Sequence, residues 1–231
     1  MVRTCHDAGH RACAERDSPM IIATAVTSTL AVLAPVLTIL QSSTQAARIR
    51  RTGAKGVSVA TWLLTVFVAQ TWLCYGFVFH VPAEVWANVP ALAVALLVTF
   101  LAAKSQGHLR TTSGGYLALS ALTASATIVG SSPARHWVLA VVAVTSSIVI
   151  YLPQLALVLR PKDLTGVSAI SWFVACLTAL SWLIYGLLIH QPAVALPSVV
   201  MLPAALVILI QVLRHRIKND PGAGLQAPLV E

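Results

Sequence analysis

The sequence contains few charged residues. Only 10% of its 231 residues are Asp, Glu, Lys or Arg, whereas 58% are hydrophobic, and the mean hydropathy is +0.83. Soluble globular domains carry roughly a quarter charged residues. The low charge content therefore excludes an ordinary soluble domain and predicts an all-α integral membrane protein. The net charge of +8 does not indicate nucleic-acid binding, because the basic residues lie in short connections between apolar segments.

Acidic residues are absent from the interior of every apolar segment. Glu84 is interpreted as part of a turn beside Pro82, and Asp163 as part of a basic loop. Charges inside a membrane mark proton relays and ion pathways, so their absence argues against proton coupling and against a pump. The segments also lack Lys, which excludes a retinal Schiff base. No nucleophile with its base, phosphate-binding loop or metal-ligand cluster is found, so we expect neither an enzyme nor a cofactor or bound metal.

Cysteine is also scarce, with four residues in the chain. Cys5 and Cys13 lie in the polar stretch 1–19 and do not have the spacing of a standard zinc site. Cys74 and Cys176 lie in apolar segments and are interpreted as small hydrophobic core residues. The stretch 1–19 is predicted to be a flexible extension rather than a secretory signal, because it has no apolar core.

Seven apolar segments approach the length of about 20 residues that a helix needs to cross a bilayer. The fourth is short and rich in Ala, Ser and Thr, so it must pack against protein or cross a locally thinned bilayer. The first begins at Met20, and the sequence is compatible with a start codon at either Met1 or Met20. The predicted spans cover residues 20–41, 57–80, 85–103, 116–131, 137–159, 167–190 and 194–213.

The distribution of Lys and Arg predicts the orientation. With the N-terminus outside, eleven of the fifteen basic residues fall in connections on the inner side, and the other four are Arg3, Arg11, Arg16 and Arg135. Short cytoplasmic loops are enriched in basic residues. We therefore expect a multi-pass protein of the plasma (cell) membrane with an extracytoplasmic N-terminus (1–19) and a cytoplasmic tail (214–231).

The chain contains an internal repeat. Residues 70–82 read QTWLCYGFVFHVP and residues 180–192 read LSWLIYGLLIHQP, with identical letters at six positions and an offset of 110. Two three-span units in the same orientation need an odd number of linking spans, which the fourth segment supplies. The expected division is a first three-helix repeat (20–103), a linker with the fourth helix (104–136) and a second three-helix repeat (137–213). The sequence thus predicts two parallel three-helix bundles joined by a linker helix.

The repeat places aromatic and polar side chains at one depth. Trp72 precedes His80 by eight residues and Asn88 follows it by eight, so both should lie on the order of 10 Å below the turn. The same spacing pairs Trp182 with Ser198. An indole face and an amide suit the apolar and hydroxyl groups of a neutral sugar. Each Trp could instead be a packing or interfacial residue, and Asn88 a helix–helix hydrogen bond.

Four further features are found in or near the repeated segments. Tyr75 and Tyr185 lie one helical turn beyond each Trp and are read either as an outer gate or as part of an aromatic belt. Pro153 lies inside the fifth span and is a hinge in a transporter but only a bend in a static bundle. The repeated glycines, Gly76 and Gly186, predict close helix contact. The repeated histidines, His80 and His190, are interpreted as interfacial residues rather than ligands.

These motifs resemble the PQ-loop superfamily and, within it, the SWEET and SemiSWEET sugar transporters. The resemblance covers both three-span units. It is most specific in the second unit, in Leu152-Pro153-Gln154, Gly166-Val167-Ser168, Trp182, Tyr185-Gly186 and Pro192. The layout of three, one and three spans looks like the seven-helix SWEET plan rather than the single three-helix SemiSWEET.

The resemblance implies facilitated sugar transport by alternating access, through rocking of the two units. It implies that Trp72, Asn88 and Trp182 bind substrate, with Ser198 where Asn is usual, and that Pro153 and Gln154 form a hinge. In the first unit, Ser43-Thr44-Gln45 stands where the Pro-Gln pair is expected. The expected partners are a small neutral sugar and the lipid bilayer. Two fused units should complete one pathway, so a monomer would suffice, although a homo-oligomer is compatible with the sequence.

Two other functions are weighed against sugar uniport. A PQ-loop transporter of another small solute, such as an amino acid carried with protons, would require a titratable group in a span. Asp163 is the nearest candidate identified. A non-transporting PQ-loop receptor would bind a ligand or partner without flux. Kinship of fold does not separate these classes, whereas the Trp/Asn pairing and the uncharged spans favour the sugar carrier.

Overall fold

The computed structural model of the chain is all-helical and describes residues 23–41, 43, 47, 58–132, 134–135, 137–152 and 169–219. The seven helices among these described residues confirm the predicted fold class of a seven-helix membrane protein. Five of them contain stretches long and apolar enough to cross a membrane. These are the N-terminal helix Ala23–Gln41, α2 (Val59–Val78), α3 (Pro82–Ser105), α7 (Ala169–Leu188) and α8 (Pro192–Asn219).

The fourth helix is longer than predicted. Helix α4 spans Leu109–Gly130, so it begins seven residues before the predicted start at residue 116. The hydroxyls of Thr111, Thr112 and Ser113 each donate to a backbone carbonyl oxygen one turn earlier. Such bonds let hydroxyl side chains enter a helix without an unpaired polar group. The polar start of α4 is therefore helical although it does not look like an apolar span.

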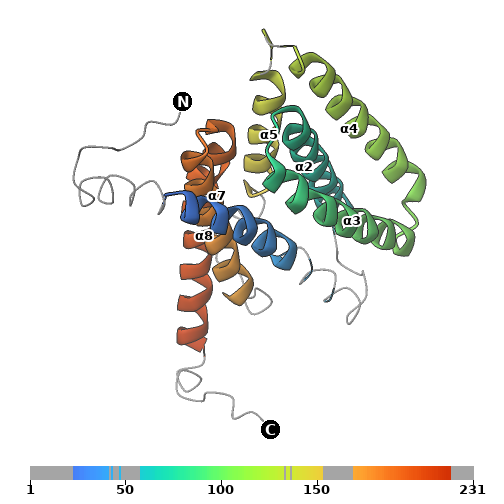
Figure 1. Cartoon of the computed structure of the whole chain (residues 1–231). Coiled ribbons are helices and arrows are strands. Elements are labelled where there is room, and N and C mark those ends of the chain that lie inside the picture. The colour runs from blue at the N-terminus through green and yellow to red at the C-terminus, as the bar shows by residue number, and fades with distance from the viewer. Residues whose placement is uncertain are drawn as a thin grey trace, which may run out of the picture.

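Helix α4 packs against protein, as its short apolar segment requires. Figure 1 shows it on the side of α2 and α3 that faces away from α7 and α8, and it contacts α2, α3 and α5. The Gln70 amide nitrogen on α2 donates to the hydroxyls of Tyr116 and Ser120. Helix α5 spans Trp137–Val149. The predicted fifth span extends to residue 159, and its part beyond Leu152 lies outside the described residues.

The two repeated turns share one backbone design. His80 and His190 both adopt a left-handed conformation with φ of 54°. The next backbone N–H closes each turn on the repeated glycine's carbonyl oxygen over 2.9 Å (Val81 to Gly76, Gln191 to Gly186). This is the helix-ending pattern in which a left-handed residue reverses the chain, and histidine tolerates it better than most residues. Pro82 and Pro192 then begin α3 and α8, where a missing N–H costs nothing.

The repeated glycines bring the helices of each hairpin together. A Cβ atom on Gly76 would lie 3.0 Å from the Cβ of Glu84, and one on Gly186 would lie 2.6 Å from the backbone nitrogen of Ala195. Real Cβ atoms almost never approach other atoms as closely as at Gly186, and the distance at Gly76 is shorter than most real Cβ contacts. The predicted close contact is therefore confirmed in both hairpins, α2–α3 and α7–α8.

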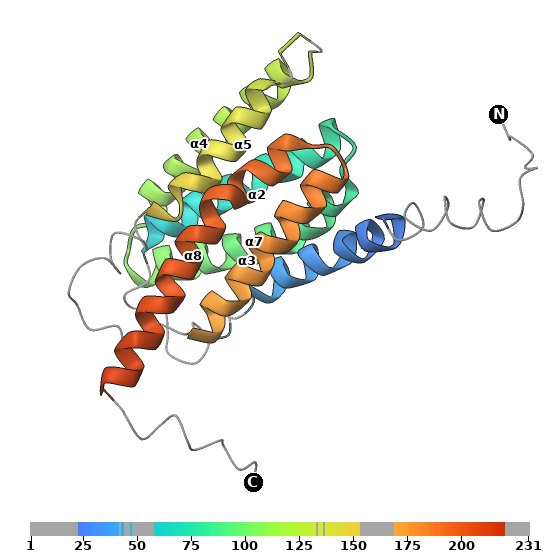
Figure 2. The ribbon, with the colours of Figure 1, turned by 90° about the vertical axis from the view of Figure 1, so that its left-hand side faces the viewer.

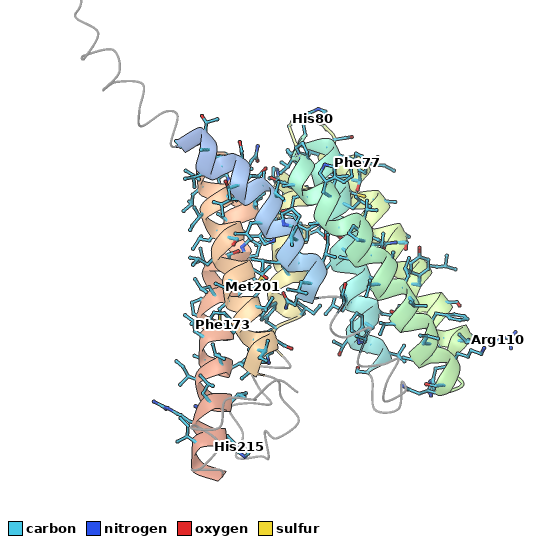
Figure 3. The ribbon with its side chains drawn as sticks, turned by 60° about the horizontal axis from the view of Figure 1, so that its bottom comes forward. Phe77, His80, Arg110, Phe173, Met201 and His215 are labelled. Carbon is cyan, nitrogen blue, oxygen red and sulfur yellow. The ribbon has the colours of Figure 1, made fainter. Side chains whose placement is uncertain are left out.

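The two hairpins run in the same direction. Tyr75 lies near the end of α2, and Gln191 comes directly before α8. The Tyr75 hydroxyl donates to the side-chain oxygen of Gln191, so both turns lie at one end of the bundle. We call this the hairpin end. Figure 2 shows α7 beside the N-terminal helix and α8 between α7 and α5, and α5 also contacts α2. Figure 3 shows His80 at the hairpin end, with Arg110 and His215 at the opposite end and Met201 between them.

The surface of the bundle is suited to lipid. Large hydrophobic side chains are exposed on the outer faces of several helices, including Leu117 and Ile128 on α4 and Ile170 on α7. The centre is filled largely by small residues and by one cluster that contains Trp72, Tyr75 and Tyr185 together with Leu139 and Val194. The apolar exterior and the aromatic centre are the arrangement expected of a bundle embedded in a bilayer.

Candidate functional site

One cavity of about 150 Å³ lies inside the bundle and collects side chains from six helices. All four residues predicted to bind substrate line it: Trp72 on α2, Asn88 on α3, Trp182 on α7 and Ser198 on α8. The other lining residues are Thr38, Gln41, Val68, Glu84, Ser147, Tyr151, Thr178, Ala179, Val194, Pro197 and Met201. Helix α4 contributes none of them, which agrees with its position on the outside of the bundle.

The two tryptophans are held by hydroxyl groups of the opposite unit. The Trp72 indole nitrogen donates to the Ser147 hydroxyl over 2.7 Å, and the Trp182 indole nitrogen donates to the Thr38 hydroxyl over 3.0 Å. Thr38 and Ser147 occupy nearly equivalent positions, with an offset of 109. Each indole N–H is therefore already paired, and the ring faces remain for contact with a ligand. Sequence reasoning missed both hydroxyl partners.

Asn88 is bonded to a neighbour on its own helix. Its side-chain nitrogen donates to the backbone carbonyl oxygen of Glu84 over 2.8 Å and to a carboxylate oxygen of Glu84 over 2.9 Å. An amide group has two N–H donors and one oxygen acceptor. The sequence predicts that all three are available to a solute. In this structure both donors are directed at Glu84, and the amide oxygen is left for a ligand.

The interpretation of Glu84 as a turn residue is wrong. Helix α3 begins at Pro82, so Glu84 lies in its first turn, and the side chain is only 5% exposed and lines the cavity. Gly76 has no side chain and leaves room for it. A carboxylate near a helix N-terminus is also favoured by the helix dipole. Proline followed by an acidic residue is a helix-start signal that could have revealed this position. The argument that the spans contain no charge therefore fails at Glu84.

The two halves of the cavity differ chemically. At the offset of 110, Glu84 corresponds to Val194 and Asn88 corresponds to Ser198. All four side chains are buried and line the cavity. The face contributed by α3 is therefore a carboxyl–amide pair, whereas the equivalent face of α8 is an aliphatic side chain and a short hydroxyl. The sequence identified the second difference, and the structure adds the first.

Tyr75 lies between the cavity and a second hollow at the hairpin end. Its hydroxyl donates to the Gln191 side-chain oxygen over 3.1 Å, and its ring meets Trp72 edge-on at 5.2 Å and stacks on Phe79 at 4.3 Å. Tyr75 and Gln191 both line the second hollow, of about 390 Å³. Tyr185 meets Trp182 edge-on at 5.8 Å and lines neither space. The two tyrosines thus have equivalent aromatic contacts but different polar surroundings.

Gln41 and Tyr151 form a second polar contact between the units. Both line the cavity, and their side chains are hydrogen-bonded to each other. Gln41 ends the N-terminal helix and Tyr151 follows α5. The predicted hinge residues Pro153 and Gln154 lie outside the described residues, as does the loop residue Asp163.

The lining of the cavity is mostly apolar and includes several polar side chains. Among the described residues that line it, none is Lys, Arg or His, and Glu84 is the one carboxyl group. Over the part of the chain that the structure describes, no group of three His, Cys, Asp or Glu side chains could hold a metal ion. The described cysteines, Cys74 and Cys176, are free and pack with hydrophobic neighbours. The arrangement can hold an uncharged solute between two indole rings, hydroxyl groups, an amide oxygen and a carboxyl group.

Part of the chain matches the model of a known protein family. Residues 137–215 match the model of a family described as "Sugar efflux transporter for intercellular exchange". The matched segment contains α5, α7 and most of α8, and therefore Trp182, Tyr185 and Ser198. No curated protein matches the chain.

Proposed function

We propose that the chain is a facilitative carrier of a neutral sugar, because residues 137–215 match a family of sugar efflux transporters and its motifs resemble those of the SWEET family. The observation that carries this proposal is the single cavity in which Trp72, Asn88, Trp182 and Ser198 meet. These residues come from both repeats, so a solute held there would lie between the two units. The carrier is a uniporter that works by alternating access.

The sugar is held by two kinds of contact. The faces of Trp72 and Trp182 cover its apolar C–H surfaces, since their N–H groups are already bonded to Ser147 and Thr38. The Asn88 amide oxygen accepts a hydrogen bond from one hydroxyl, and Ser198 serves another. A cavity of about 150 Å³ is below the usual range of about 300–1,000 Å³ for ligand pockets. Binding therefore occurs in a state in which the two units have moved apart.

Alternating access uses the polar contacts at the two ends of the cavity. Tyr75 and Gln191 form a gate at the hairpin end, where their hydrogen bond lies beside the outer hollow. Tyr185 supports this gate by packing against Trp182. Gln41 and Tyr151 close the other end. The two three-helix repeats rock about the cavity, and Pro153 with Gln154 acts as the hinge of the second repeat.

The carrier is oriented in a plasma membrane with its hairpin end outside. Lys104 ends α3, Arg110 begins α4 and Arg214 lies near the end of α8, so these basic residues share the end opposite the turns. Arg135, between α4 and α5, is at the hairpin end. Basic residues prefer the cytoplasmic side, which supports an extracytoplasmic N-terminus and a cytoplasmic C-terminus.

Flux measurements in liposomes test this function. Purified protein is reconstituted, and uptake of a panel of radiolabelled neutral mono- and disaccharides is compared with that of empty liposomes. Trp72→Ala and Asn88→Ala should each abolish uptake while the protein remains helical and monodisperse. Trp86→Ala is the matched control, because Trp86 lies on α3 but is 72% exposed on the outside of the bundle.

Two results would contradict the proposal. Absence of flux for every sugar in the panel would show that the protein is not a sugar carrier, and saturable binding without flux would indicate a receptor. Normal uptake by both Trp72→Ala and Asn88→Ala would show that the cavity is not the binding site. Loss of uptake in Trp86→Ala equal to that in Trp72→Ala would mean that the effect is not specific to the cavity.

A further inference from the structure

Glu84 is a chemically isolated group in the transport cavity. It is the only Asp or Glu between residues 18 and 162, and no other follows Asp163 before Asp220. The side chain is 95% buried, since 5% of it is exposed, and it lines the same cavity as the two tryptophans. A buried ionisable residue within a membrane protein points to a function by default, because its burial is costly.

Among the described residues, the surroundings of Glu84 provide a hydrogen-bond donor but no positive charge. Asn88 donates to one carboxylate oxygen over 2.9 Å. For the second oxygen, the described residues supply no donor. None of the described residues that line the cavity is Lys, Arg or His. The ionisable groups that interact with Glu84 are the phenols of Tyr75 on α2 and Tyr185 on α7, which cannot supply a positive charge.

This environment limits the charge states in which the cavity can close. Taking an unpaired carboxylate out of water costs several kcal/mol even after relaxation, and such a group usually becomes neutral instead. A neutral sugar brings no counter-charge into the cavity. Closing both ends around the sugar therefore requires that Glu84 has first become neutral.

We propose that Glu84 is a proton-binding site of the transport cavity, and that the sugar-loaded carrier changes its accessible side only while this proton is bound. This inference rests on the proposed function as a sugar carrier. The proton is taken from water on the open side and forms an O–H bond with the carboxylate oxygen that Asn88 does not contact. When the cavity is open to either side, this O–H bond forms or breaks by exchange of the proton with water on that side. The empty carrier returns with the proton bound, because closing the cavity on a carboxylate is as costly without sugar as with it. No bond of the sugar forms or breaks.

The asymmetry of the repeat fixes the number of protons at one. The equivalent position of α8 is Val194, which cannot titrate. One proton is therefore bound during every crossing, loaded or empty, so no net proton transport accompanies the sugar and the carrier remains a uniporter. Because the proton is required, the rate of transport should be highest at low pH and should fall as the pH rises through the titration of Glu84.

The test compares the pH dependence of sugar flux in the full-length protein and Glu84→Gln. Glucose exchange into proteoliposomes is measured with equal pH on both sides, from about pH 5 to about pH 9, because buried carboxyl groups can titrate as high as about pH 8–9. In the native protein the rate should fall by about tenfold for each pH unit above the midpoint, as for one titrating group. Gln is neutral at every pH and keeps an oxygen that can accept a hydrogen bond from Asn88. The exchange rates of Glu84→Gln at about pH 5 and at about pH 9 should therefore agree within about twofold.

Asp163→Asn is the matched control, because the sequence predicts that this acidic residue lies in a basic loop between two spans. It should keep the pH profile of the native protein. His80, His190 and the tyrosines are present in all three proteins, so their titration cannot produce a difference between them. A flat native profile overturns the inference, and so does the same slope in Glu84→Gln. A folded Glu84→Gln protein without uptake at any pH also overturns it, since the negative charge itself would then be required, as for a cationic solute.

A second readout separates this inference from the proposed function. The tryptophan fluorescence of the protein in nanodiscs is titrated over the same pH range without sugar, because Trp72 and Trp182 line the cavity with Glu84. A step in the fluorescence titration of the native protein that is absent in Glu84→Gln supports the proton site, whether or not sugar flux is observed. If no sugar flux is observed, only the sugar-carrier function fails. Sugar flux with a flat pH profile and no fluorescence step overturns the proton site and leaves the carrier function intact.

Discussion

The indole nitrogen of Trp72 donates a hydrogen bond to the hydroxyl oxygen of Ser147 over 2.7 Å, and this bond joins a helix of the first repeat to a helix of the second. Trp182 repeats the relationship through Thr38. Each tryptophan is therefore held at the cavity by the other unit rather than by its own. Movement of one unit relative to the other must strain or break both bonds, so they couple the position of the rings to the state of the carrier.

Ser147→Ala should destabilise the protein. It removes the acceptor of Trp72 and leaves a buried N–H unpaired, which costs about 1–3 kcal/mol. Ser146→Ala is the matched control, because the neighbouring Ser146 hydroxyl donates only to the Ala143 carbonyl oxygen. Its effect should be the smaller of the two, because removal of this donor leaves no buried N–H unpaired. Thermal unfolding in detergent measures both, and equal shifts would refute the importance of the Trp72–Ser147 bond.

Tyr75→Phe should favour the state that is open at the hairpin end. It removes the hydroxyl that donates to Gln191 but keeps the ring contacts with Trp72 and Phe79. Loss of about 0.5–1.5 kcal/mol from the closed state would shift the equilibrium roughly 2- to 12-fold. The measurement is the rate at which a hydrophilic maleimide labels Val194→Cys in a cysteine-free background.

The control for the proposed gate is Tyr116→Phe on α4. The Tyr116 hydroxyl accepts a hydrogen bond from Gln70 and lines neither cavity space. This substitution should leave the labelling rate unchanged. Equal acceleration by both substitutions would mean that labelling reports general loosening of the bundle rather than the gate.

Gly186→Ala should be strongly destabilising. The new Cβ would lie 2.6 Å from the backbone nitrogen of Ala195, and a backbone atom cannot move aside as a flexible side chain can. Overpacking of this kind typically costs about 1–3 kcal/mol. Gly114→Ala on α4 is the control, because nothing lies within 4 Å of its added Cβ. There the better helix propensity of alanine should raise stability by up to about 1 kcal/mol. Unfolding of Gly186→Ala at the native temperature would contradict this account.

The reciprocal exchanges Asn88→Ser and Ser198→Asn should have unequal effects. Asn88→Ser removes the amide that donates to the Glu84 carboxylate, so it should lower the free energy of unfolding by about 1–3 kcal/mol. Ser198→Asn breaks no such bond and adds a donor to the cavity. It should lower KM for a monosaccharide roughly 2- to 10-fold, the effect of about one hydrogen bond. Similar losses of stability in both variants would show that the Glu84–Asn88 pair has no special role.

Much of the architecture follows from local properties of the sequence. Apolar length and basic loops are local quantities, so they predict the helices, and the repeated letters predict two equivalent hairpins. Residues equally far from a turn lie at equal depth, so the spacing predicts that Trp72, Asn88, Trp182 and Ser198 lie at one level. In the structure these four residues line one cavity. The start of α4 was missed, because hydroxyl-rich helices resemble loops in composition.

The sequence by itself determined the all-α membrane class, the parallel repeat and the mismatch between Asn88 and Ser198, because hydropathy and spacing along a helix do not depend on distant partners. Only the tertiary structure decided which groups are paired. In the structure, the Trp72 indole N–H donates to the Ser147 hydroxyl and the Asn88 amide donates to the Glu84 carboxylate. Glu84, predicted to lie in a turn, lines the cavity. The physical reason is that hydrogen-bond partners depend on how packed helices are rotated and how close they lie. Close contacts at glycines and the turns that end helices fix that rotation and distance, and both lie far from the paired atoms.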